Sequence, residues 1–404
     1  MPFVVEDIFS TARVDMDDYV RISPLETLCH YRYPDGTQLD VVSDPEMVAS
    51  KLASIFGENP EQVKAYFDHC ATIYDLTADL FLFHPIRTDF TLLRHLNWGQ
   101  AIRTLLNLPR VDASRTMHEA NASFFDHPQT IQLFDRRATY AGSSPYQAPG
   151  TLNIIQHVDY SIGGYRVEGG VNALVEALEH LAEDLGVILH YDSPVEQIIV
   201  EGQEIVGLEV NGERIDCPQV ISNADVNSTY HDLLGDTSSK AARRYKQLEP
   251  SSSAIVFYWG IDGVHDGLDI HNILFSENYK REFADIFSRQ TPPEEPTVYI
   301  YISSKYAPDH APAGCENWFT MINAPYDSGQ DWDREVNRMR DIIQAKIAKM
   351  TGIDVGSRIR AERVLTPLDL ASRTNSPHGA IYGISSNTKW AAFLRQNNRS
   401  ASYR

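Results

Sequence analysis

The sequence predicts an α/β fold, α+β overall, from three patterns of apolar residues. Residues 171–181 place apolar side chains at helical spacing directly after the Gly169-Gly170 turn. Residues 187–190, 196–200, 205–210 and 214–217 form short β-like runs, and Asn211-Gly212 is a hairpin signal between the last two. Residues 297–302 alternate Val and Ile with Thr and Tyr, the period of a strand. Helical and strand periods therefore occur in one chain, in separate blocks.

The N-terminal part is predicted to combine helices with a β-type turn. A short helix is expected near residues 4–9, followed by a β-type turn at residues 33–37. A second helix covers residues 44–56, because Asp44 is a good N-cap and Pro45 suits the first turn. A longer helix begins at Pro60 and carries an apolar stripe through residue 81, most simply interpreted as a core-facing surface.

Residues 84–110 differ from the rest of this acidic chain. Four arginines stand there against one aspartate, interleaved with leucines and Trp98. A basic amphipathic stretch of this kind can lie in a membrane interface. An ordinary solvated helical face is the alternative interpretation, and both remain open.

The C-terminal half is predicted to be a sheet with one long helix. Strands are expected at residues 251–261, with a fully buried run at 254–259, and at 297–302, 318–322 and 360–365. An amphipathic helix at residues 331–350 is expected to end near Gly352.

Composition excludes several function classes. The 404 residues carry a formal net charge of −20, which argues against a nucleic-acid partner because such binding relies on Lys and Arg. The four cysteines are scattered, as reduced thiols of a reducing compartment would be. No apolar run of 18 residues and no signal-peptide pattern occurs, so a cytoplasmic protein is expected.

Two groups of residues have the side chains of a reactive site but not its spacing. His265, Asp266 and His271 are ligand-type residues, but their spacing indicates a surface turn, and no metal site is predicted. Ser143-Ser144 lacks the G-x-S-x-G elbow of a serine nucleophile, and Pro145 follows it. Neither group is therefore predicted to carry chemistry.

Three motifs in order carry a family resemblance. Residues 139–149 read Thr-Tyr-Ala-Gly-Ser-Ser-Pro-Tyr-Gln-Ala-Pro, residues 167–178 begin Val-Glu-Gly-Gly, and residues 220–225 read Val-Ile-Ser-Asn-Ala-Asp. This ordered set resembles the bacterial carotenoid (phytoene) desaturases, with a slight lean, from residues 317–325 and 382–388, to the hydroxycarotenoid 3,4-desaturase branch. The resemblance implies a two-dinucleotide-binding-domain flavoprotein fold with an inserted substrate domain of sheet and helices.

The glycine pattern predicts that this fold is incomplete. No two of the 23 glycines stand two positions apart, so the dinucleotide fingerprint G-x-G-x-x-G is absent. The family pattern places that motif before residue 1 and a second flavin segment after residue 404. The chain is therefore expected to be a fragment lacking both.

The resemblance also implies a reaction. A bound FAD takes hydride from a long isoprenoid polyene such as phytoene while a proton leaves the adjacent carbon, giving one more C=C bond. The hydrophobic carotenoid needs an apolar tunnel, and the protein is expected to lie peripherally on the inner face of the membrane. Candidate tunnel residues, each open to a plain core role, are Phe124, Phe125, Phe257, Tyr258, Trp259, Trp318 and Phe319.

Carried over to this chain, the resemblance gives domain and site expectations. Residues 1–150 are mostly a substrate or cap domain, with 60–110 the membrane-facing candidate. Residues 151–245 are a FAD-domain segment, 246–365 the substrate-domain sheet and helices, and 366–404 the start of a truncated return to the FAD domain. Cofactor-binding candidates are Pro194 and Val195, at the segment resembling the adenine contact, and Asn223 and Ala224, at the segment approaching the dinucleotide. No catalytic residue is assigned.

Two other functions stay open at this level. One is a polyene- or membrane-binding protein without catalysis, and the other is a related flavin oxidoreductase that acts on retinoids or amines.

Overall fold

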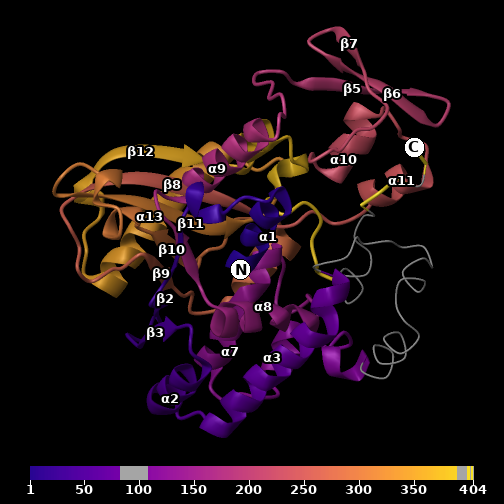
Figure 1. Cartoon of the computed structure of the whole chain (residues 1–404). Helices are drawn as coiled ribbons and strands as arrows, with labels where there is room; N and C mark the ends of the chain where they lie inside the picture. Colours follow the sequence, from indigo (N-terminus) through magenta and orange to yellow (C-terminus); the bar gives the residue numbers. More distant parts are fainter. Residues whose placement is uncertain (82–107, 389–397, 401, 404) are drawn as a thin grey trace.

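The computed structural model describes residues 1–81, 108–388, 398–400 and 402–403 (Figure 1). Its largest element is a seven-stranded sheet of order β12-β8-β11-β10-β9-β2-β3. Neighbouring strands are antiparallel, except that β2 runs parallel to β9. The strands are β2 (Thr27–Arg32), β3 (Gln38–Val42), β8 (Ser253–Asp262), β9 (His271–Leu274), β10 (Val298–Tyr301), β11 (Cys315–Ala324) and β12 (Ile359–Leu365).

Helix α13 (Trp332–Thr351) covers one face of this sheet and closes its main core. Asp331 caps its first turn, and Gly352 ends it with a φ of 77°. The strands predicted at 251–261, 297–302, 318–322 and 360–365 are confirmed as β8, β10, β11 and β12. The expected full burial of residues 254–259 is wrong at Tyr258, which is 41% exposed because alternate β8 side chains point to the opposite face.

A helical layer packs beside the β2–β3 edge (Figure 1). The predicted helices at 44–56 and from Pro60 are confirmed, with Asp44 accepting from the amides of Glu46 and Met47. The basic stretch at 84–110 falls almost wholly outside the described residues. Among the helices of the described residues, none is both long enough and apolar enough to cross a bilayer. The layer contains α2 (Pro45–Phe56), α3 (Pro60–Phe81), α6 (Met117–Asn121), α7 (Pro128–Asp135) and α8 (Ile154–His157).

A separate three-stranded antiparallel sheet of order β5-β6-β7 lies apart from the large sheet (Figure 1). The turn between β6 and β7 confirms the predicted hairpin, with Asn211 and Gly212 at φ 52° and 75°, and the turn between β5 and β6 has Gly202 at φ 70°. The strands are β5 (Val195–Glu201), β6 (Glu204–Val210) and β7 (Glu213–Asp216). The remaining elements are α1 (Pro2–Ala12), β1 (Ile22–Pro24), β4 (Tyr165–Val167), α9 (Val171–Asp184), α10 (Val226–Ser228), α11 (Lys240–Lys246), α12 (Tyr279–Ala284) and α14 (Pro367–Thr374).

The helix predicted after Gly170 is confirmed as α9, and its apolar stripe is partly uncovered, since Val171 and Val175 are 70% and 57% exposed. The strand predicted directly after it is wrong. Residues 187–190 are not a buried strand, and Ile188 is 78% exposed. A strand needs a neighbour for its backbone groups, and no described strand pairs with this run.

Residues 218–224 are likewise extended without being a strand. They make no backbone–backbone hydrogen bond with any described residue, and Ile221 is 99% exposed. The segment leads directly into α10, which Asp225 caps through the amide of Asn227.

Candidate functional site

Two neighbouring cavities meet at the loop formed by residues 376–384. The first has a volume of about 340 Å³ and the second about 390 Å³. Ile381 and Tyr382 line both of them. Because one loop forms part of both walls, ligands in the two cavities would lie close together.

Hydrogen bonds from distant segments hold this loop in place. Ser251 donates its amide to Gly383 O at 2.7 Å, and Ser253 Oγ donates to Gly379 O at 2.6 Å. Beyond the loop, the Ser386 amide donates to Ser143 Oγ at 2.8 Å. Ser143 is buried, so this serine anchors the backbone that follows the loop.

The first cavity lies between the loop and the start of α10. Asn223 and Ala224 line it together with Asp225, whereas Pro194 and Val195 lie at the exposed start of β5 and line neither cavity. The structure thus brings two of the four predicted cofactor-binding residues to a cavity and leaves the other two apart.

The second cavity lies against the sheet face opposite α13. Alternate side chains of the strands reach it, because the other set packs into the α13 core. Of the predicted tunnel residues, Phe257, Trp259 and Trp318 belong to that core instead. Phe124 and Phe125 pack in the helical layer, so their tunnel role is also not supported. The cavity is lined by Leu25, Leu28, Cys29, Tyr31, Arg136, Arg137, Thr139, Tyr140, Asp159, Gly164, Tyr165, His271, Tyr299, Met321, Asn323, Ile381 and Tyr382.

His271 gives this cavity a neutral imidazole. Its Nδ1 lies 2.9 Å from the Tyr299 hydroxyl, and its ring stacks on Tyr299 and Tyr301. Burial lowers the pKa of His271 to about 4, so the ring is uncharged at neutral pH. The prediction of a surface turn is wrong here, since His271 opens β9.

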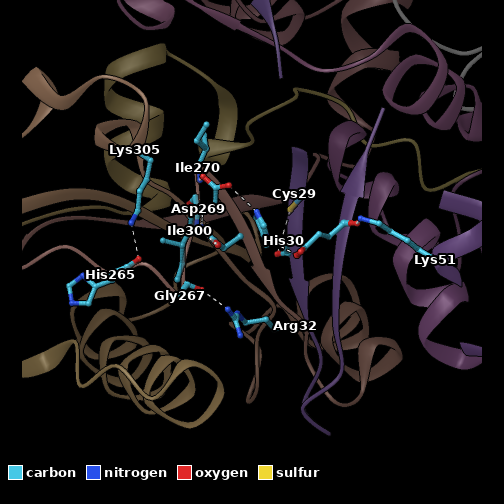
Figure 2. A network of polar contacts seen from close by, with 12 residues as sticks. Cys29, His30, Arg32, Lys51, His265, Gly267, Asp269, Ile270, Ile300 and Lys305 are labelled. Atoms are coloured by element: carbon cyan, nitrogen blue, oxygen red, sulfur yellow. Dashed lines mark hydrogen bonds and ion pairs between the residues drawn. The ribbon is translucent and has the colours of Figure 1, made fainter. Parts of the chain in front are cut away.

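The loop before β9 is held by a polar network (Figure 2). His30 of β2 bonds Asp40 at 2.5 Å and Asp269 at 3.0 Å through its two ring nitrogens. Arg32 donates to Gly267 O at 2.5 Å, and Lys305 donates to His265 O at 2.8 Å. These contacts fix the loop and thereby the position of the following strand.

The surface turn predicted around His265 and Asp266 forms, with the Leu268 amide donating to His265 O at 3.2 Å. The His265 side chain nevertheless points inward, is 9% exposed, and places its Nδ1 2.8 Å from the carboxylate of Glu316, which is itself 2% exposed. Within the described ranges, no cluster of His, Cys, Asp and Glu side chains could hold a metal ion. His265 therefore belongs to a structural ion-pair cluster.

Sequence reasoning missed most residues of the second cavity, Arg136 and His271 among them. A signal existed in the consecutive arginines 136 and 137, which precede Tyr140. Pattern alone does not say that both line one cavity or which of them pairs with a carboxylate.

Known proteins resemble this chain over nearly all of its length. The 1-hydroxycarotenoid 3,4-desaturase of Flavobacterium sp. (strain P99-3) is 38% identical over 404 residues, which cover 98% of this chain and 80% of that protein. The chain belongs to the carotenoid desaturase family. A 4,4'-diaponeurosporene oxygenase of Staphylococcus haemolyticus is 28% identical, covering 96% of this chain and 77% of that protein. No family model matches the chain.

Solved structures identify the fold of this desaturase. Putrescine oxidase superposes with a TM-score of 0.53 at 12% identity, over 95% of this chain and 83% of that one. An oxidoreductase from Methanosarcina mazei superposes with a TM-score of 0.52 at 15% identity, over 93% of this chain and 81% of that one. The predicted fold class is confirmed, as is the enzyme class, a FAD-dependent oxidoreductase.

Proposed function

We propose that this protein dehydrogenates a C–C bond of a carotenoid in the second cavity, in the manner of the hydroxycarotenoid 3,4-desaturase branch. The observation that carries the proposal is the shared wall: Ile381 and Tyr382 join an aromatic cavity to the cavity of Asn223 and Ala224. A redox cofactor and an apolar substrate need this kind of adjacency.

The first cavity fits one part of a bound FAD. Its volume of about 340 Å³ suits a portion of a dinucleotide. The backbone amides of Asn223 and Ala224, unpaired among the described residues, can donate to phosphate or carbonyl oxygens, and the Asp225 carboxylate can accept from a hydroxyl group. When bound, FAD supplies the hydride acceptor, which no side chain can replace. Asn223 and Ala224 would hold it, and Pro194 and Val195 are proposed as contacts of a more distant part.

The second cavity supplies the substrate environment. Leu25, Leu28 and Met321 give apolar contacts, and Tyr31, Tyr140 and Tyr299 give aromatic ones. Because His271 is neutral, an apolar polyene can bind beside it without removing water from a charged imidazole. These side chains orient the polyene and exclude water from the reacting carbons.

Domain roles and membrane contact belong to the same proposal. Residues 151–245 and 366–404 would form the FAD side, while residues 246–365 and most of 1–150 would form the substrate side. The basic amphipathic composition of residues 84–110 supports peripheral contact with the inner face of the membrane, where a carotenoid dissolves.

Blocking the second cavity tests this proposal. With FAD and a carotenoid in lipid vesicles, the protein is expected to lengthen the conjugated system, seen as a red-shifted visible spectrum. Met321→Trp should lower kcat/KM about 10- to 100-fold, because the larger ring occupies the substrate volume. Met47 on α2 is 49% exposed, so Met47→Trp is the matched control and should leave the rate unchanged.

The same assay separates the other candidate functions. Carotenoid that binds without spectral change would favour a non-catalytic binding protein. Conversion of amines or retinoids in place of carotenoids would favour a different oxidoreductase. Equal activity of Met321→Trp and the unchanged protein would place the substrate elsewhere.

A further inference from the structure

Arg136 places a cation in the wall of the second cavity without an anionic partner. Its guanidinium lies over the rings of Tyr31 and Tyr140, at 5.9 and 5.4 Å from their centroids. No ion pair or hydrogen bond joins this side chain to another described residue, and it is only partly exposed. An arginine stays protonated in proteins, so the charge persists there.

The neighbouring arginine has an anionic partner, which sharpens the contrast. Arg137 is 2% exposed, pairs with Asp159 at 2.6 Å and donates to the Tyr31 hydroxyl at 3.0 Å. Asp159 is the only carboxylate among the described residues that line this cavity. Since Arg137 neutralises it, the cavity keeps one uncompensated positive charge.

Such a group favours a ligand that carries one hydrogen-bond acceptor. A partly buried cation without hydrogen bonds is unfavourable, and two aromatic faces compensate only part of its lost hydration. The guanidinium has five N–H donors in a planar fork. The surrounding leucines, tyrosines and Met321 suit a neutral apolar chain, so the complementary ligand is a hydrocarbon with an oxygen atom near one end.

Resting on the proposed function, we propose that Arg136 binds a hydroxyl or carbonyl oxygen on the end group of the carotenoid. The hydroxycarotenoid preference contained in the proposed function would then depend on this one side chain. Because Arg136 and Tyr382 line the same cavity, the position of the bound oxygen also determines which carbons of the substrate lie beside the loop at residues 376–384. The new double bond should therefore form near the oxygenated end.

A pair of matched substrates tests this inference. Arg136→Leu should lower kcat/KM for an end-hydroxylated carotenoid about 10- to 100-fold, the loss of one charged hydrogen bond. The value for the same polyene without the hydroxyl should fall much less, so the preference for the hydroxylated substrate should drop. Arg136→Lys keeps the charge but loses the fork, so an intermediate loss is expected, together with a less uniform double-bond position.

A control and a binding measurement keep the outcomes distinct. Arg166 lies 5.3 Å from the Tyr306 ring and lines neither cavity, so Arg166→Leu removes a similar cation–π contact elsewhere and should not change the substrate preference.

Carotenoid binding followed by quenching of protein fluorescence shows whether the variants still fold and bind. Equal losses for both substrates, or none, would overturn the role of Arg136 while leaving desaturation intact. Failure of the unchanged protein to bind or convert either carotenoid would instead remove the proposed function and this inference with it.

Discussion

Gly379→Ala is expected to abolish carotenoid conversion, with a loss above about 100-fold. Gly379 is buried at a φ of +69°, and a Cβ there would lie 2.0 Å from the backbone oxygen of Pro367. A left-handed alanine costs about 1–2 kcal/mol before any clash is counted. The Pro367 oxygen belongs to the backbone and cannot shift at low energetic cost. The loop must therefore move, and Ile381 and Tyr382 move with it in both cavities.

Conversion assays and thermal melts of the two proteins check this expectation. Gly267→Ala is the matched control, since its new methyl group would meet no atom within 4 Å. That variant should change the free energy of unfolding by no more than about 0.5 kcal/mol. Full activity of Gly379→Ala would show that the loop does not position the reactants.

Glu316→Gln is expected to destabilise the protein by about 3–5 kcal/mol, the usual effect of removing one member of a buried ion pair. The Glu316 carboxylate receives Lys305 at 2.7 Å, His265 at 2.8 Å and Trp318 Nε1 at 2.9 Å. A neutral amide would leave the Lys305 ammonium buried without its anion. Urea unfolding should show the loss.

The matched control is an exposed pair on the same sheet. Asp262 and Arg360 pair at 2.5 Å, but their side chains are 48% and 67% exposed. Asp262→Asn should therefore cost no more than about 1 kcal/mol. Similar losses in the two variants would mean that burial does not strengthen the Glu316 cluster.

The Glu316 cluster also predicts a pH dependence. Burial acts to raise the pKa of Glu316, but hydrogen bonds from Lys305, His265 and Trp318 outweigh it, and the pKa lies below its usual value. The stabilisation is therefore complete above the unfolded-state pKa of about 4.3 and is lost as the pH falls through the lower folded value. Unfolding free energies of the unchanged protein and Glu316→Gln should converge in that acidic range.

Local elements are predictable wherever the signal is short-range. Asp44, Gly352 and the Asn211-Gly212 turn act through their own neighbouring backbone, and the structure confirms each of them. The prediction for residues 187–190 is wrong because an apolar β-like run becomes a strand only beside a partner strand. The helix predicted at residues 171–181 is confirmed, but its spacing does not say which residues cover Val171 and Val175, and these two remain exposed.

The sequence alone determined the family, the redox chemistry implied by it and most strand and helix positions, because ordered motifs, caps and periodicities are written in consecutive residues. Only the tertiary structure decided which side chains face a cavity. Arg136 and Arg137 are adjacent in the chain and line the same cavity, yet Arg137 pairs with Asp159 whereas Arg136 lies over the rings of Tyr31 and Tyr140. That difference depends on where the separate segment that carries Asp159 packs, which local patterns do not encode.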